Sequence, residues 1–144
     1  MGWYIRPVSP AEEAELLDAD DAPPGWRDRV VNMGETMPEM YVALANDDGN
    51  ATAATFGIEG GVEFGPDVGF GPLRYIAPDL VKKVAAELGR IEEEEFALRF
   101  VLRDDTGAAE IPGHVNGLVR RYRDFRQCYL DAARNGDGMA IVIY

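Results

Sequence analysis

The sequence predicts a single α+β domain over residues 1–144, in which a small sheet packs against several helices. The chain begins and ends with strand-like runs, Trp3–Val8 and Met139–Tyr144, and amphipathic helical patterns fill much of the sequence between them. A chain of 144 residues is also long enough for one domain with its own core. We therefore expect the sheet to come largely from the N- and C-terminal strands.

The first helix is expected directly after the first strand. Ser9 is its predicted N-cap, and Glu12 completes a capping box three residues later. We expect the helix to end near residue 17, before an acidic, proline-containing loop over residues 18–25.

The following segments have weaker patterns. Apolar residues at helical spacing predict a second helix over Trp26–Met33. Residues 37–58 have two interpretations. In the first, Tyr41–Leu44 and Thr52–Phe56 are strands of a hairpin around the polar residues 46–50. In the second, the first half of the segment is a helix.

A long glycine-rich connection is expected over residues 57–71, followed by a short strand at Leu73–Ile76. The glycines at 65, 69 and 71 do not form a nucleotide-binding loop, because the Gly-Lys-Ser/Thr sequence of a phosphate loop is missing. We expect instead a tight backbone crossing in which glycine permits unusual dihedral angles.

The C-terminal half has the clearest periodicity. A helix is predicted over Pro78–Gly89, and four consecutive acids, residues 92–95, begin the next one. The expected buried stripe of that second helix is Phe96, Ala97, Phe100 and Val101. After a turn at 104–109, the longest helix is predicted over His114–Asn135. The terminal strand is apolar throughout, so we expect it inside the sheet with both faces covered.

The composition argues against several classes of partner. With 26 acidic and 14 basic residues, the chain has a formal net charge of −12. Nucleic acids and anionic membranes attract basic proteins, so we expect neither as a partner, whereas a basic protein suits this charge. No apolar run approaches the roughly 20 residues of a membrane-spanning helix. One cysteine and no signal-peptide pattern lead us to expect a cytoplasmic protein.

The inventory of reactive side chains is sparse. The chain has one serine, one histidine and one cysteine. Ser9 is expected to cap a helix, and Cys128 lies within the longest predicted helix as a buried or half-buried residue. A serine or cysteine nucleophile beside a histidine is therefore not expected. Zinc sites need three or four Cys or His ligands, so we expect no such metal and no cofactor.

A few residues remain as candidates for chemistry. Glu63, Asp67 and Arg74 form a candidate carboxylate–arginine cluster in the glycine-rich region. His114 is a candidate general base, although no spacing links it to a carboxylate partner. Arg74 is also a candidate ion-pair partner for Asp67 or Glu63. The candidate aromatic binding residues are Trp3, Tyr4, Phe70 and Tyr75.

Three stretches resemble the YfbM-like family of small bacterial proteins. The first is Met1-Gly2-Trp3-Tyr4 followed by Val8-Ser9-Pro10, and the second is Asp67–Leu80. The third contains Glu110-Ile111-Pro112-Gly113, Leu118, Tyr122, Asn135-Gly136-Asp137 and the terminal strand. Together they cover roughly two-thirds of the chain. Residues from about 20 to 60 depart from the family pattern, which leads us to expect a helix rich in Trp, His and Leu there, whereas this chain has Met37–Leu44 and no histidine.

The resemblance implies a fold and a helix in the first half of residues 37–58. It implies no activity, because the family has none established. From the residues we expect a non-catalytic binding domain, for example an immunity-like one that neutralises a basic partner. The alternatives are an enzyme built on the carboxylate–arginine cluster and a small-molecule sensor built on the aromatic residues. The oligomeric state stays open.

Overall fold

The computed structural model describes residues 2–18, 26–69 and 71–143. Within these ranges, only the backbone is described at residues 17–18, 26–27, 64–69 and 71–72. The described strands are β1 (Trp3–Val8), β2 (Val31–Gly34), β3 (Val62–Gly69), β4 (Gly71–Ile76) and β5 (Gly138–Ile143). They form one sheet in the order β2-β1-β5-β4-β3, with every neighbouring pair antiparallel. The terminal strands β1 and β5 pair directly, which confirms the predicted α+β fold.

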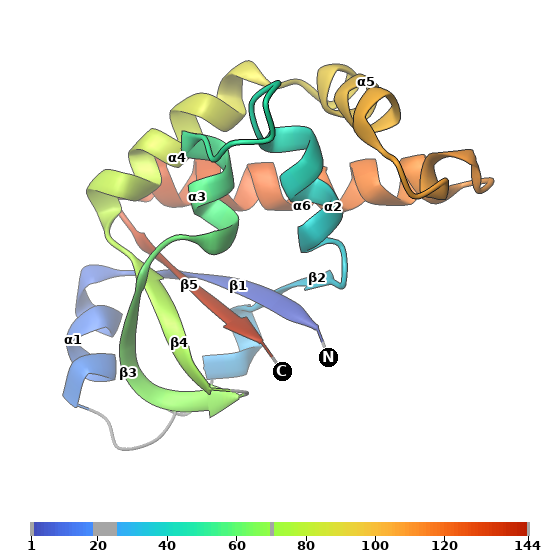
Figure 1. Cartoon of the computed structure of the whole chain (residues 1–144). Coiled ribbons are helices and arrows are strands. Elements are labelled where there is room, and N and C mark those ends of the chain that lie inside the picture. The colour runs from blue at the N-terminus through green and yellow to red at the C-terminus, as the bar shows by residue number, and fades with distance from the viewer. Residues whose placement is uncertain (1, 19–25, 70, 144) are drawn as a thin grey trace.

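Helices cover both faces of this sheet (Figure 1). On one face lies α1 (Pro10–Asp18); the other face carries the main helical layer. That layer contains α2 (Met37–Leu44), α3 (Ala53–Glu59), α4 (Pro78–Arg90), α5 (Glu93–Arg103) and the long α6 (His114–Asn135). Short 3₁₀ turns are found at Trp26–Arg29 and Ala108–Glu110.

The pleat of β5 divides the core in two. Met139 and Ile141 pack into the large cluster under the helical layer, whereas Ala140 and Val142 join the small cluster under α1. All four side chains are buried, so the prediction of a strand covered on both faces is confirmed.

The cap predicted for α1 is confirmed. The main-chain N–H of Glu12 donates to Ser9 Oγ at 3.2 Å, and the main-chain N–H of Ser9 donates to Glu12 Oε1 at 3.1 Å. A second carboxylate oxygen of Glu12 binds the buried Arg6 at 2.6 Å. The box therefore also ties α1 to β1.

The helix predicted over Trp26–Met33 is wrong. Only Trp26–Arg29 forms a 3₁₀ turn, and the chain continues into the edge strand β2. Val30 and Val31 are β-branched and favour an extended backbone, and β1 supplies the antiparallel partner, with Ile5 opposite Val31. A distant strand thus decides a segment whose local pattern suggested a helix.

The hairpin interpretation of residues 37–58 is also wrong, and the helical one is confirmed for its first half. The second half is helical too. Thr52 and Thr55 are common in strands, but here they form a reciprocal cap at the start of α3, with main-chain N–H to hydroxyl distances of 2.8 and 3.2 Å.

The glycine-rich segment is not a simple connection. Residues 62–69 form β3, which pairs with β4 in a hairpin whose register shifts between Phe64 and Asp67 and again between Asp67 and Gly69. Glycine and proline are tolerated in a strand at such irregularities, especially at the edge of a sheet. The glycine and proline residues that accommodate these register shifts made the segment look like a loop in the sequence, although it forms a strand.

The stripe predicted to be buried on α5 is confirmed only for its two phenylalanines. Phe96 and Phe100 are buried, but Ala97 is half-buried and Val101 is 49% exposed. Val101 lies about 140° around the helix from Phe96, at 100° per residue, and so points away from the core.

Candidate functional site

The histidine predicted as a candidate base has a carboxylate partner. His114 begins α6 and Glu39 lies in the first turn of α2, with Nε2 and Oε2 2.5 Å apart. Each side chain is 30% exposed, so the pair lies at the surface. The positive φ of Gly113, 81°, reverses the chain immediately before α6 and sets the position of His114.

The His114–Glu39 pair stands between two hollows. One, of about 320 Å³, is lined by Thr36, Glu39, Gly113, His114, Gly117, Leu118 and Arg121. The other, of about 360 Å³, is lined by Pro38, Glu39, Val42, Phe100, Asp104, Asp105, Thr106, Ala108 and His114. Both polar side chains of the pair therefore contribute to two separate concave surfaces.

Asp104 lies next to this pair and organises the loop after α5. Its carboxylate accepts hydrogen bonds from the hydroxyl of Thr106 at 2.6 Å and from the main-chain N–H of Ala109 at 2.9 Å. These bonds, with a smaller contribution from His114, lower the pKa of Asp104. An ionised carboxylate therefore holds the loop that leads to α6.

Helix α5 presents an apolar face to solvent. We call Glu94, Leu98, Val101, Leu102 and Asp105 the α5 outer face. Its three apolar side chains are 54%, 49% and 75% exposed in sequence order. By helical geometry the four positions on the helix, Glu94, Leu98, Val101 and Leu102, lie within about 100° of one another and opposite Phe96 and Phe100. Asp105 follows two residues after the helix ends. An acidic residue stands at each end of the apolar stripe.

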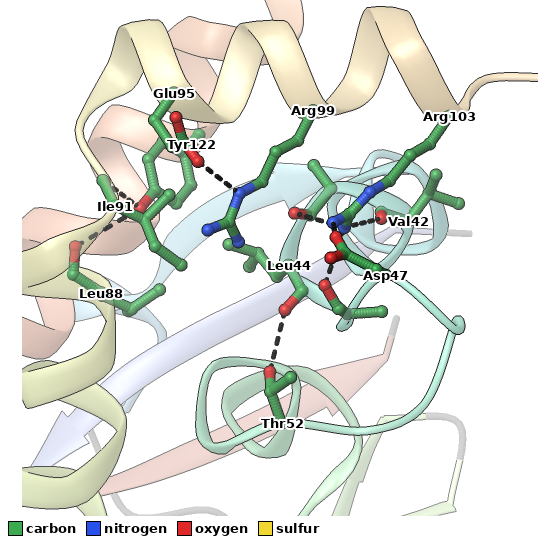
Figure 2. Close-up of polar contacts among 12 residues, drawn as sticks. Val42, Leu44, Asp47, Thr52, Leu88, Ile91, Glu95, Arg99, Arg103 and Tyr122 are labelled. Carbon is green, nitrogen blue, oxygen red and sulfur yellow. Dashed lines mark hydrogen bonds and ion pairs between the residues drawn. The ribbon is translucent and has the colours of Figure 1, made fainter.

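The inner side of α5 is firmly attached, as Figure 2 shows. Arg103 donates to the main-chain carbonyls of Val42, Ala43 and Ala45 at 3.1, 3.2 and 2.7 Å. It also reaches Asp47 at 2.8 Å, while Arg99 binds Glu95 at 2.9 Å. The rings of Phe96 and Tyr122 stack with centroids 4.0 Å apart.

Only two of the three side chains of the candidate carboxylate–arginine cluster are described. Glu63 stands opposite Arg74 in the β3–β4 register, and the side chain of Asp67 lies outside the described residues. Arg74 donates to the carbonyls of Ile58 at 2.9 Å and Gly60 at 3.4 Å, and to that of Glu59. The described hydrogen bonds of Arg74 therefore go to carbonyl groups at the C-terminal end of α3, and none of them goes to a carboxylate.

The aromatic candidates lie on opposite sides of the sheet. Trp3 packs against the large core cluster and lines a hollow of about 210 Å³ with residues of α2 and α3. Because side chains alternate along a strand, Tyr4 points to the opposite face of the sheet. On that face the hydroxyl of Tyr75 donates a hydrogen bond to Glu13 at 2.9 Å. Phe70 lies outside the described residues. Trp3 therefore does not share a pocket with Tyr4 and Tyr75.

Cys128 is buried, as predicted, and burial raises the pKa of its thiol to about 12. In the described part of the chain, no three His, Cys, Asp or Glu side chains are grouped to hold a metal ion. No helix among the described residues is both long and apolar enough to cross a membrane.

Sequence reasoning missed Glu39 and Arg121. Glu39 is 75 residues from His114, and a contact of that separation leaves no local pattern. Arg121 lies seven residues after His114 and therefore on the same face of α6. This helical spacing is the one sequence pattern from which Arg121 could have been predicted.

The fold and its sites define a small α+β domain of a known type. A solved structure with the same fold is the crystal structure of a protein of unknown function, YfbM, from Escherichia coli. The two chains are 14% identical, with a TM-score of 0.68, and the match covers 100% of each. The family described as Domain of unknown function (DUF1877) matches residues 40–142, so the chain belongs to this family. No curated protein matches. The predicted resemblance is thus confirmed.

Proposed function

We propose that this domain is a non-catalytic protein-binding module whose α5 outer face receives a basic, amphipathic segment of a partner protein. An immunity-like role, in which the domain covers and neutralises a basic partner, is one form of this function. The observation that carries the proposal is the exposed stripe of Leu98, Val101 and Leu102. Grouped apolar side chains at a surface mark interaction sites, whereas scattered single ones do not.

The attachment of α5 supports a binding role for its outer face. Phe96 and Phe100 are buried, and Arg103 links the end of the helix to the carbonyls at the end of α2. A surface held in this way loses little conformational entropy when a partner docks.

Charge selects the chemistry of the partner. Glu94 and Asp105 border the apolar stripe, and the whole chain has a net charge of −12. Lysine or arginine residues beside an apolar ridge would complement both features. A nucleic acid would be repelled by the same charge.

A second copy of the chain fits this face poorly. If two α5 helices met in antiparallel fashion, Glu94 of one would lie near the C-terminal end of the other, which Asp104 and Asp105 follow. A parallel arrangement would oppose identical acids. Both arrangements place like charges together at the edge of an apolar contact, so we propose a different, basic protein as the partner. With its single buried cysteine, the domain suits a reducing compartment such as the cytoplasm.

The test is a capture experiment followed by affinity measurement with the purified partner. Leu98→Ser/Leu102→Ser interrupts the stripe, and Glu94→Gln/Asp105→Asn removes its charges. Val62→Ser is the matched apolar control, since Val62 is 65% exposed on β3. Asp48→Asn is the acidic control in an exposed loop. We expect the leucine variant to weaken binding about tenfold or more, and the charge variant to weaken it and reduce its salt dependence.

Both controls should bind as the unmodified domain does. A partner that keeps its full affinity for Leu98→Ser/Leu102→Ser would show that the α5 outer face is not the docking surface. A captured partner that is acidic would contradict the proposed chemistry.

A further inference from the structure

The hollow on the α6 side of the His114–Glu39 pair is independent of the proposed protein-binding function. None of its lining residues belongs to the α5 outer face. Its volume of about 320 Å³ lies at the lower end of the range for small-molecule sites. His114, Glu39, Arg121 and Thr36 supply its polar side chains.

The imidazole of His114 is oriented by Glu39, and its second ring nitrogen is available to a ligand. Nε2 is engaged by Glu39 at 2.5 Å, and Nδ1 has no hydrogen-bond partner among the described residues. When the ring is neutral and Nε2–H donates to Glu39, Nδ1 is an acceptor. A carboxylate that orients an imidazole in this manner fixes its tautomer for contact with a ligand.

Arg121 is likewise oriented without being fully engaged. Its Nη1 donates to the main-chain carbonyl of Asn32 at 2.5 Å. In the described part of the chain its other N–H groups meet no protein acceptor. A guanidinium has five donors in a planar arrangement suited to carboxylate and phosphate groups. Glu39 keeps its negative charge when His114 is neutral, so the attraction of Arg121 for an anion has to outweigh that repulsion.

Gly117 lies between these two side chains. His114, Gly117 and Arg121 occupy positions i, i+3 and i+7, which share one face of α6. Glycine in a helix interior destabilises the helix relative to alanine. Packing does not require it here, since a Cβ at Gly117 would meet no atom within 4 Å. The missing side chain keeps the floor of the hollow open between an imidazole and a guanidinium.

We propose that this hollow binds a small organic anion that carries a hydroxyl or amine group. Arg121 holds the carboxylate or phosphate, and the hydroxyl or amine donates to Nδ1 of His114. Gly117 lets the ligand approach the helix backbone.

The single histidine makes a direct test practical, because the imidazole ¹⁵N spectrum of the labelled protein contains one residue. Lactate and glycerol 3-phosphate are titrated separately, which distinguishes a carboxylate from a phosphate ligand, and glycerol is the neutral control. We expect at least one anion to shift the Nδ1 resonance of His114 saturably at or below about 10 mM. Glycerol should cause no saturable shift.

Gly117→Ala and Arg121→Gln should each weaken this binding about tenfold or more. Gly117→Ala should also keep or raise the melting temperature, so a folding defect cannot explain its loss of binding. Gly89→Ala, a second helical glycine with only Leu130 near its Cβ position, should bind as the unmodified protein does. The proposal is overturned if neither anion gives a saturable shift, if glycerol gives the same shift, or if Gly117→Ala binds with unchanged affinity.

Discussion

The successive helices α4 and α5 differ in the face that they turn to solvent. Each buries one stripe: Val81, Val84, Ala85 and Leu88 on α4, and Phe96 and Phe100 on α5. The outward side of α4 includes the exposed Lys82 and Lys83. The corresponding side of α5 carries Leu98, Val101 and Leu102. Only α4 therefore has the polar exterior expected of a helix on the surface of a monomeric protein.

On α5, the residues that stabilise the fold and the exposed apolar residues lie on opposite sides of the helix. The core of the described domain is complete without the outer side chains of α5, so folding does not explain why they are apolar. An uncovered apolar face of this kind is what the proposed binding function would use. The difference can be tested by changing the inner and outer residues of the two helices separately.

The largest effect is expected on the inner side of α5. Phe96→Ala should lower the free energy of unfolding by about 3–5 kcal/mol, because it leaves a cavity and removes the stacking on Tyr122. Leu98→Ala, two residues along the same helix, should cost about 0.5 kcal/mol or less. Urea unfolding of both variants measures the contrast. Equal losses would mean that the outer face also stabilises the fold.

A smaller loss is expected from the arginine that joins α5 to α2. Arg103→Gln should cost about 2 kcal/mol, because three carbonyls at the end of α2 lose a charged donor. Arg99→Gln is the matched control, since its i,i+4 pair with Glu95 is worth about 0.5 kcal/mol. Urea unfolding compares the two. If Arg99→Gln costs more, the carbonyl contacts of Arg103 are not what attaches α5.

Outer-face substitutions should change surface properties more than stability. Leu98→Ser/Leu102→Ser should alter the free energy of unfolding by about 1 kcal/mol or less. It should also reduce the fluorescence of an apolar dye bound to the native protein, because the apolar stripe is interrupted. Lys82→Ser/Lys83→Ser on α4 should leave dye binding unchanged. Dye binding that persists in the leucine variant would locate the exposed apolar surface elsewhere.

The smallest effects are expected in the pH dependence of two carboxyl groups. The pKa of Asp104, after α5, is lowered by its hydrogen bonds, chiefly that from Thr106. Its stabilisation is present above about pH 4 and is lost as the pH falls through the lowered pKa. Burial raises the pKa of Asp137, before β5, so its ionisation disfavours the fold as the pH rises through that pKa.

Unfolding measured between neutral and acidic pH distinguishes these signs. Asp104→Asn should lower stability at neutral pH and flatten the acid-induced loss. Asp137→Asn should raise stability at neutral pH, and this gain should disappear in acid. The same sign for both variants would contradict the opposite environments of the two groups.

Several features were determined by the sequence itself because their signals are local. Ser9 and Glu12 lie three residues apart and cap α1 as predicted. The periodicity of residues 78–90 and 114–135 specifies α4 and α6, and the uninterrupted apolar run at the C-terminus specifies the central strand β5. In each case the pattern that predicts the element lies within one short stretch of consecutive residues.

Tertiary structure alone decided the rest, because it depends on contacts between distant segments. Val31–Gly34 becomes a strand since β1 pairs with it, and the irregular β3 exists because β4 does. The sequence offers apolar residues on two sides of α5, and only packing against α2 and α6 selects Phe96 and Phe100 for the core. His114 obtains Glu39 only when α2 docks beside the start of α6. No local pattern encodes a pairing across 75 residues, so packing determined both candidate sites.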